Sequence, residues 1–332
     1  MALLKESIEE LLLGRYTLDA LDLKSELVQA VFKYQKKHNF VYREYIHLLG
    51  AQSAITPVFL PISTFKTHQV RSGSSTPISA VFKSSSTTGK GRSSHYVSDL
   101  SWYEMVAQRT FESHFGPLNE WRILALLPSY HEQKESSLLY MVDHFIQQTK
   151  DPFSGYYHGQ MDRLLKILRK ASSTKRTLLW GVSYALLDLI DILNGDLLDP
   201  GVVVIETGGM KGRRKELPKQ ALHKLLQEGL GVRVVSSEYG MTELLSQAYL
   251  KEGLLFTPAN TMRVFVSEIN DPLTLSPVGK GVLNILDLAN VDSCSFIQTE
   301  DLGEVFEDGR FTVNGRLDNT QLRGCNLLYS EV

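Results

Sequence analysis

The most distinctive stretch of the sequence runs from Val81 to Ser94 and reads Val-Phe-Lys-Ser-Ser-Ser-Thr-Thr-Gly-Lys-Gly-Arg-Ser-Ser. It follows a short apolar run, residues 78–82, that is typical of a β-strand, and it then becomes rich in hydroxyl groups, glycine and positive charge. Backbone N–H groups that converge in a small concavity bind anions, and phosphate is the common biological case. The stretch therefore predicts a loop that holds phosphate.

Two other interpretations of this loop compete with the first. Clusters of Ser, Thr and Gly between patterned segments are often solvated linkers. A kinase-like P-loop requires Gly-x-x-x-x-Gly-Lys-[Ser/Thr]. Here Ser84 stands at the first glycine position, and Gly91 stands where a magnesium-binding hydroxyl belongs. The P-loop interpretation therefore fails at two positions.

The composition is that of an ordinary soluble protein, and the net charge of −2 argues against general affinity for nucleic acid or anionic membranes. The two cysteines, Cys294 and Cys325, argue against a disulfide framework and for a reducing compartment. The N-terminus reads as an amphipathic helix and not as a signal peptide. The most apolar long stretch, residues 178–193, is interrupted by Asp188 and Asp191. We therefore expect a cytoplasmic protein without a membrane span or a nucleic-acid partner.

From about residue 78 onward, short β-like runs alternate with helical patterns. The expected strands are residues 78–82, 122–127, 177–182, 201–205 and 232–236. The expected helices are residues 98–115, 136–148, 160–171, 184–194 and 218–228. This alternation, with nearly continuous apolar strands, predicts a mostly parallel, buried sheet.

The two ends of the chain have other patterns. Residues 3–50 are helical in pattern, and residues 18–37 form the clearest helix. After residue 255, β runs at 262–269, 281–288 and 310–313 follow one another without helices between them, which predicts an antiparallel portion. We expect three parts: a helical lead-in at 1–70, an α/β core at 71–255 that includes the expected phosphate-binding loop, and an antiparallel β portion at 256–332.

Four distinctive loops follow expected strands, after Phe82, Leu127, Ile205 and Ser236. Ligands of α/β sheets bind outside the carboxyl ends of the strands. The four loops therefore predict one shared site.

The loop after Ile205 contains Gly208 and Gly209, followed by basic residues. Paired glycines permit close approach of the backbone to a flat ligand, and the basic residues suit phosphates. A plain turn with solvated basic residues is the alternative interpretation.

The loop after Ser236 continues Ser-Glu-Tyr-Gly-Met-Thr-Glu, ending at Glu243. The ring of Tyr239 can stack on a base, and the hydroxyl of Thr242 can bind a phosphate. A carboxylate such as Glu243 suits Mg²⁺, which takes oxygen ligands. The alternative is that Tyr239 packs in the core and that Glu243 is an exposed acid at a helix start.

A third pattern lies near the end of the chain, where residues 298–303 read Gln-Thr-Glu-Asp-Leu-Gly and residues 314–318 read Asn-Gly-Arg-Leu-Asp. The carboxylate of Asp301 has two acceptor oxygens, which suit two neighbouring ribose hydroxyls. Asp308-Gly309 between the two patterns indicates a hairpin turn. Asp301 as a simple turn residue is the alternative.

Taken in order, these stretches resemble the adenylate-forming, acyl-CoA synthetase-like superfamily. Residues 84–91 resemble its Ser/Thr/Gly run ending in Thr-Gly-Lys-Pro-Lys, with Ser86 in place of a glycine and Gly91-Arg92 in place of Pro-Lys. Tyr-Gly-Met-Thr-Glu matches its core motif. The third pattern resembles Thr-Gly-Asp-Leu-Gly followed by Gly-Arg-x-Asp, with Glu300 in place of a glycine.

A narrower resemblance is to the LuxE-type acyl-protein synthetases, carried by residues 32–35, 59–66 and 323–325. It implies the large N-terminal domain of the adenylate-forming fold: mostly parallel sheets flanked by helices, with a small antiparallel portion and without the mobile C-terminal domain. The implied reaction activates a fatty or other carboxylic acid with ATP and Mg²⁺ to acyl-AMP. The acyl group then passes to Cys325 and onward to a reductase partner.

The resemblance also implies roles for individual residues. Thr242, Glu243 and Lys90 serve adenylation, with Glu243 on the magnesium ion, and Cys325 carries the acyl group. His131 lies at the acyl pocket. The remaining ATP-binding residues are Ser85, Ser86, Thr87, Thr88, Gly89, Gly208, Gly209, Glu238, Tyr239, Gly240, Met241, Asp301 and Arg316. Cys294, which has no motif around it, is expected to be a buried apolar residue.

One departure from the superfamily concerns its essential lysine. Larger members continue into a mobile domain that bears this lysine, whereas the present sequence stops at Val332. One of Lys83, Arg92, Lys211 and Arg213 substitutes for it, or adenylation is slow, or a partner completes the site. The alternatives to an acyl-protein synthetase are a ligase that uses free coenzyme A and a non-catalytic nucleotide- or acyl-binding subunit.

Overall fold

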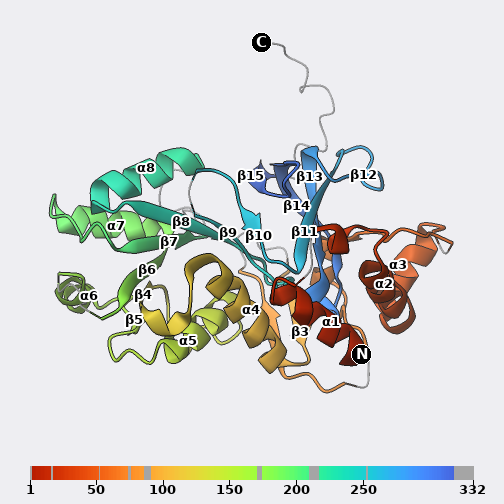
Figure 1. Ribbon diagram of the computed structural model, residues 1–332, viewed down its shortest axis with the longest axis horizontal. Coiled ribbons are helices and arrows are strands. Elements are labelled where there is room, and N and C mark those ends of the chain that lie inside the picture. Colours follow the sequence, from red (N-terminus) through yellow and green to blue (C-terminus); the bar gives the residue numbers. More distant parts are fainter. Residues whose placement is uncertain are drawn as a thin grey trace, which may run out of the picture.

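The computed structural model of the chain describes residues 2–15, 18–51, 53–73, 76–85, 91–169, 174–208, 217–251 and 253–317. It consists of two β-sheets of seven and six strands, together with a two-stranded hairpin. Figure 1 shows the seven-stranded sheet between layers of helices, and beside it the six-stranded sheet with the N-terminal helices on its flank.

The seven-stranded sheet has the order β10-β9-β8-β7-β6-β4-β5. Its strands are β4 (Trp121–Leu126), β5 (Gly155–Tyr156), β6 (Arg176–Val182), β7 (Val203–Thr207), β8 (Val234–Tyr239), β9 (Ala248–Leu250) and β10 (Thr257–Pro258). The five strands from β5 to β8 are parallel, and β9 and β10 are antiparallel additions at one edge. Every residue of β4 and β7 is buried, which confirms the mostly parallel, buried sheet that the apolar runs predict.

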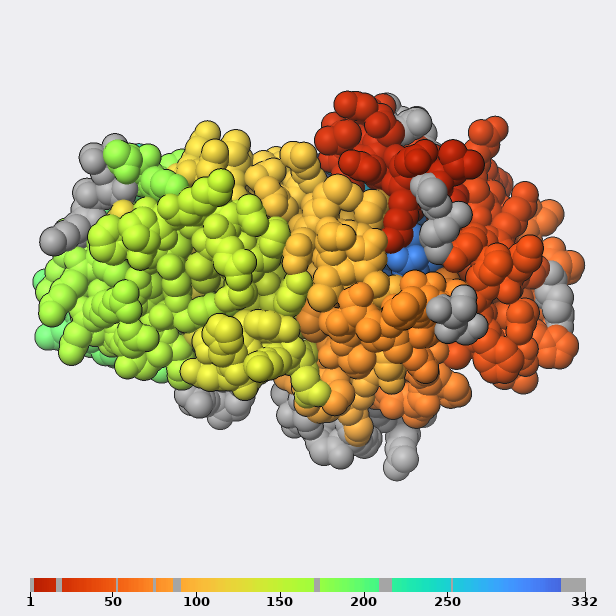
Figure 2. Space-filling view, turned by 90° about the horizontal axis from the view of Figure 1, so that it is seen from below, coloured from red at the N-terminus to blue at the C-terminus, as the bar shows by residue number. Residues whose placement is uncertain are grey.

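Helices cover both faces of this sheet. Helices α4 (Leu100–Phe115) and α5 (Ser137–Thr149) lie on one face, and α7 (Ser183–Leu193) and α8 (Lys219–Leu230) lie on the other (Figure 1). Helix α6 (Met161–Leu168) connects β5 to β6, and the short η3 (Leu118–Glu120) precedes β4. Figure 2 shows the face of the molecule that carries α4 and α5. Residues from the first half of the chain form almost all of this face.

The hairpin consists of β2 (Ala80–Lys83) and β3 (Ser94–Val97), paired antiparallel. The expectation that the loop after Phe82 leaves the parallel sheet, like the other three loops, is therefore wrong. The reason is the alternation in β3, where His95 and Val97 are buried and their neighbours are partly exposed, so this segment is a partner strand for β2.

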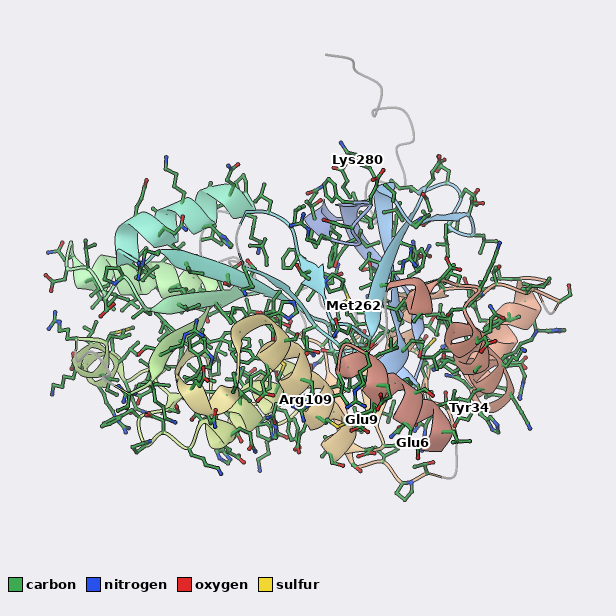
Figure 3. The ribbon with its side chains drawn as sticks, viewed as in Figure 1. Glu6, Glu9, Tyr34, Arg109, Met262 and Lys280 are labelled. Atoms are coloured by element: carbon green, nitrogen blue, oxygen red, sulfur yellow. The ribbon has the colours of Figure 1, made fainter. Side chains whose placement is uncertain are left out.

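The six-stranded sheet contains the antiparallel portion that the sequence predicts. Its strands are β1 (Leu60–Pro61), β11 (Met262–Ser267), β12 (Leu275–Ser276), β13 (Gly279–Asp287), β14 (Phe296–Val305) and β15 (Phe311–Arg316). All pairs are antiparallel except β1 with β14. Met262 lies in the interior at the start of β11, whereas Lys280 projects from the far end of the sheet (Figure 3). The boundaries of the three expected parts stay a prediction.

The N-terminal segment forms α1 (Ala2–Leu12), η1 (Leu18–Leu21), α2 (Glu26–His38), α3 (Phe40–Leu48) and η2 (Ile62–Lys66). The single helix expected at 18–37 is interrupted, because Ser25 caps the N-terminus of α2 by accepting a bond from the Val28 N–H at 3.4 Å. Buried Gln35 donates to the Val291 carbonyl (3.0 Å), near η4 (Leu288–Asn290), and so fixes α2 to the six-stranded sheet. None of the helices in the described ranges has the length and apolarity needed to span a membrane.

Candidate functional site

The two large sheets meet at the end of β8. Phe256 and Phe311 form an isolated antiparallel bridge with N···O distances of 2.7 and 3.1 Å, and the ring of Tyr239 packs on both side chains. The Tyr239 hydroxyl donates a hydrogen bond to Asp301 Oδ2 on β14 at 3.0 Å. The last residue of β8 is thereby joined directly to the six-stranded sheet. Strand β8 extends to Tyr239, so the expected loop after Ser236 is shorter than the sequence pattern suggests.

Asp301 and Arg316 are register partners on β14 and β15. Arg316 Nε lies 3.8 Å from Asp301 Oδ1, and Arg316 Nη2 lies 3.3 Å from Glu300. Asp301 is a strand residue, not the turn residue of the alternative interpretation. Burial raises the pKa of Asp301, while the Tyr239 hydrogen bond and the Arg316 charge act in the opposite direction. The structure therefore brings together Tyr239, Asp301 and Arg316, which are distant in sequence.

The loop after β8 is held from two sides. Nδ1 of His95 on β3 donates to the Thr242 carbonyl at 2.7 Å, and Asn290 Nδ2 donates to the Glu243 carbonyl at 2.7 Å. Burial lowers the pKa of His95 to about 4, so the ring is neutral at neutral pH. The Asp287 carboxylate accepts bonds from the backbone N–H groups of Leu245 and Ser246, at 2.8 and 3.0 Å. The loop is thus fixed in place by the protein alone.

The Glu243 side chain is 5% exposed, and among the described residues no lysine or arginine lies within 4.0 Å of its carboxylate. Burial raises its pKa, and a hydrogen bond from Ser93 opposes that rise. A buried carboxylate without a paired cation fits a site for Mg²⁺, which proteins often hold with one or two carboxylates and the phosphates of a ligand. The described residues contain no cluster of three or more His, Cys, Asp or Glu side chains suited to a metal. Within the described residues, a metal at Glu243 would thus be held by this one carboxylate together with further oxygen ligands.

The hairpin that carries the hydroxyl-rich stretch lies against the same loop. The Ser84 N–H donates to the Ser93 carbonyl (3.1 Å), and the Ser93 N–H donates to Ser84 Oγ (2.9 Å), which closes the hairpin beyond its two strands. Since His95 of the same hairpin bonds the Thr242 carbonyl, the hairpin and the loop after β8 are connected. Ser85 is exposed. Ser86, Thr87, Thr88, Gly89 and Lys90 lie outside the described residues.

Two basic residues of the hairpin already have a partner. Glu135 forms ion pairs with Lys83 and, at 2.8 Å, with Arg92. Both had been candidates to replace the superfamily's lysine, and in this structure each is paired with a carboxylate. The other two candidates, Lys211 and Arg213, lie outside the described residues.

Gly208 follows β7 at the same edge of the sheet. It is exposed and has a φ of +67°, and its carbonyl accepts a bond from Ser183 Oγ at 2.9 Å. The positive φ explains why glycine stands at this position. Gly209 lies outside the described residues.

Two carboxylates flank this edge on opposite faces of the sheet. Glu206 is buried beside Lys219, His223 and Ser237; burial acts to raise its pKa, but the bonds and charge of these residues bring it to about 2. Glu238 instead accepts a hydrogen bond from Thr207 Oγ1 at 2.7 Å, and burial raises its pKa to about 7. One carboxylate is thus ionised at neutral pH, and the other is close to its titration midpoint.

The remaining expected site residues are placed as follows. Met241 is half-buried, and Gly240 is exposed with its backbone against the Glu238 carboxyl: a Cβ at Gly240 would lie 2.3 Å from Glu238 Oε1. His131 lies in an exposed turn between β4 and α5, and its place at an acyl pocket stays a prediction.

One of the two cysteines lies within the described residues. Cys294 is fully buried, which confirms the expectation of a buried cysteine, and burial raises its pKa to about 12. Cys325 lies outside the described residues.

The supporting residues had no motif to reveal them. His95, Asp287 and Asn290 act on a loop more than forty residues away from each of them in sequence. Residues 94–97 read Ser-His-Tyr-Val, and their alternating burial is visible only in the structure, so the sequence offers no signal for His95.

No protein-family model matches the sequence, and no curated protein matches it. Among solved structures, the fold is similar to an open conformation of 2-hydroxyisobutyryl-CoA ligase in complex with 2-HIB-AMP and CoA, with a TM-score of 0.62 and 14% identity over 88% of this chain and 74% of that chain. The same ligase in the postadenylation state with 2-HIB-AMP gives a TM-score of 0.61 and 15% identity over 88% of this chain and 66% of that chain. O-Succinylbenzoate coenzyme A synthetase (MenE) from Bacillus subtilis in complex with AMP gives a lower TM-score of 0.49 and 17% identity over 73% of this chain and 50% of that chain.

At these identities the likeness concerns the fold. The chain has the α/β fold of the large domain of adenylate-forming enzymes, as its sequence motifs imply. It spans between half and three quarters of the length of these three structures.

Proposed function

We propose that this protein is an AMP-forming ligase that activates a carboxylic acid with ATP. The observation that carries the proposal is the hydrogen bond from Tyr239 to Asp301, because it brings the strand-end motif of one sheet to the carboxylate and Arg316 of the other. These residues come from separate stretches whose order and content resemble the adenylate-forming superfamily. Their proximity is what a shared nucleotide site requires.

In the proposed reaction a carboxylate oxygen of the acid attacks the α-phosphorus of ATP. The bond from that phosphorus to the bridging oxygen breaks, and pyrophosphate leaves with the electron pair, so that the products are acyl-AMP and pyrophosphate. The hydroxyl of Thr242 would bind the α-phosphate. Magnesium at Glu243 would supply charge neutralisation on the phosphates. Such transfers depend mainly on positioning and charge, which suits a loop that the protein itself holds in place.

The nucleoside would lie along the edge formed by β7, β8 and β14. Gly208, Gly209 and Tyr239 would frame the adenine, and Asp301 with Arg316 would bind the ribose hydroxyls. Tyr239 is only 8% exposed, so the base would contact a small part of its ring. Residues 85–90 would contact the β- and γ-phosphates.

The finer proposal is an acyl-protein synthetase for a fatty acid, in which a Cys325 thiolate attacks the acyl carbonyl carbon and AMP leaves. The two cysteines support the choice of Cys325, because the thiol of Cys294 is fully buried with a raised pKa and is unsuited to accept an acyl group. The acyl group would then pass to a reductase partner in a reducing, cytoplasmic setting. The resemblance of residues 323–325 to the LuxE-type enzymes is the main support for this step.

A ligase that uses free coenzyme A is the second candidate. The similarity in fold to a structure that contains 2-HIB-AMP and CoA favours it. A non-catalytic subunit that binds ATP is the third possibility, and it predicts binding without turnover.

The first experiment is acid-dependent exchange of labelled pyrophosphate into ATP, with a panel of short, long and hydroxylated acids. We expect exchange with at least one acid and a strong loss of exchange in Asp301→Ala and Glu243→Gln. Absence of exchange with every acid would contradict the ligase and leave the non-catalytic subunit.

The second experiment follows labelled acid on the protein. The acyl-protein synthetase predicts label that is retained by the wild type and by Cys294→Ala and lost in Cys325→Ala. The coenzyme A ligase predicts instead that Cys325→Ser still forms acyl-CoA at the wild-type rate.

A further inference from the structure

We propose that Glu135 is a built-in competitor of the nucleotide phosphates: its carboxylate pairs with Lys83 and Arg92, and the polyphosphate of ATP displaces it from both. The inference rests on the proposed function for the nature of the ligand, but it does not depend on the acyl chemistry. It assigns an autoinhibitory role to a residue outside every motif of the sequence.

The geometry places one carboxylate between two cations. Lys83 ends β2, Arg92 lies two residues before β3, and Glu135 immediately precedes the residue that caps α5. Arg92 Nη1 lies 2.8 Å from Glu135 Oε2, and Lys83 Nζ contacts Oε1. Both carboxylate oxygens are therefore used on the two basic residues that flank the hydroxyl-rich stretch of the hairpin.

The remaining bonds of Arg92 fix its position. Arg92 Nε donates to the Ser84 carbonyl at 2.6 Å, and Arg92 Nη2 donates to the Lys83 carbonyl at 3.3 Å. The guanidinium is thus held over the base of the hairpin by backbone groups, and Glu135 occupies its Nη1 side. A phosphate that replaced the carboxylate would meet an arginine already in place.

The ion pairs are poorly suited to a purely structural role. The side chains of Lys83, Arg92 and Glu135 are 38%, 39% and 45% exposed, and ion pairs this exposed contribute little to stability. The hairpin has stronger supports, including the Lys83 N–H bond to the Glu135 carbonyl at 2.7 Å and the two bonds between Ser84 and Ser93. These bonds use backbone groups or Ser84 Oγ, so they persist when the Glu135 carboxylate leaves.

Phosphate oxygens can replace this carboxylate because they offer the same kind of acceptor with more charge. Arginine and lysine bind carboxylates and phosphates through the same charge-assisted hydrogen bonds. The backbone of Glu135 stays bonded to Lys83, and Ser136 caps α5 through its own side chain. Displacement therefore needs only a change of side-chain rotamer at Glu135. The affinity of the hairpin for polyphosphate therefore depends on how readily phosphate oxygens replace the Glu135 carboxylate.

The test is equilibrium binding of inorganic triphosphate, and in parallel of ATP, to the full chain and its variants. Glu135→Gln removes the competing charge, and Glu132→Gln is the matched control, since Glu132 is an exposed acid of the same loop. We expect Glu135→Gln to bind triphosphate about fivefold more tightly than the wild type at low salt, with the control unchanged. Raising the salt concentration tenfold to about 0.5 M should reduce the difference to less than about twofold.

Equal or weaker binding of triphosphate by Glu135→Gln would overturn the inference, and so would absence of triphosphate binding in all three proteins. Glu135→Ala, with its fold checked by circular dichroism, should behave like Glu135→Gln, because the backbone bonds of the hairpin do not need the side chain. Tighter triphosphate binding by Glu135→Gln without acid-dependent exchange would contradict the ligase and leave the competitor role standing. Acid-dependent pyrophosphate exchange without tighter triphosphate binding by Glu135→Gln would support the ligase and overturn the competitor role.

Discussion

The carboxyl of Glu238 makes the stability of the folded protein depend on pH. Burial raises its pKa from 4.5 to about 7, opposed by the Thr207 bond, and the Glu206 charge adds to the rise. A carboxyl whose pKa is higher in the folded state stabilises the fold in its protonated form. That stabilisation is complete below about pH 4.5 and is lost as the pH rises through about 7. Glu238→Gln keeps the size and an acceptor for Thr207 but cannot ionise.

The magnitude follows from the size of the rise. At about 1.36 kcal/mol per pH unit, a rise from 4.5 to about 7 corresponds to about 3 kcal/mol, an upper value because the side chain keeps some exposure to solvent. We therefore expect Glu238→Gln to gain up to about 3 kcal/mol in free energy of unfolding, relative to the wild type, between about pH 5 and pH 8.

Urea unfolding of both proteins at a series of pH values measures this difference. Glu132→Gln, an exposed acid, serves as the control and should follow the wild type at every pH. A difference between Glu238→Gln and the wild type that stays constant from acid to alkaline pH would show that the pKa of Glu238 is not raised in the folded protein. Thr207→Val should move the wild-type transition to higher pH, because the hydrogen bond that it removes lowers the pKa of Glu238.

Three further changes test the supports of the site. Tyr239→Phe removes the bond between the sheets, and it should cost about 1 kcal/mol in urea unfolding and raise the KM for ATP more than that for the acid. Gly303→Ala should lower the free energy of unfolding by about 3 kcal/mol or more, because its Cβ would lie 2.0 Å from the Thr312 carbonyl oxygen. The control Gly315→Ala has open space around its Cβ and should change the free energy of unfolding by less than about 0.5 kcal/mol. Asp287→Asn should cost about 2 kcal/mol and lower the rate of exchange, because a neutral amide is a poorer acceptor for the two N–H groups of the loop after β8; unchanged stability and exchange would contradict its holding role.

The fold could be predicted where burial leaves a simple pattern in the sequence. Strands such as β4, Trp-Arg-Ile-Leu-Ala-Leu, are buried throughout and appear as nearly continuous apolar runs between helical patterns. Strands that are short or lie at edges leave no such run. β3 and β9 have four and three residues, and their places depend on partners elsewhere in the chain.

The site could be predicted to the extent that its residues stand in contiguous motifs at strand ends. Tyr239 and Asp301 belong to two such motifs, and the structure joins them. The residues that hold these motifs could not be predicted in the same way. His95 bonds the carbonyl of Thr242 across 147 positions, and such a contact follows from how the hairpin packs on the sheets, not from any local pattern.

A crystal structure with a non-hydrolysable acyl-adenylate analogue would show directly whether these residues form the nucleotide site. We expect the ribose hydroxyls on the Asp301 carboxylate, the adenine beside Gly208 and Tyr239, and the phosphate mimic at Thr242. An analogue bound with its ribose away from Asp301 and its phosphate mimic away from Thr242 would show that the nucleotide site lies elsewhere.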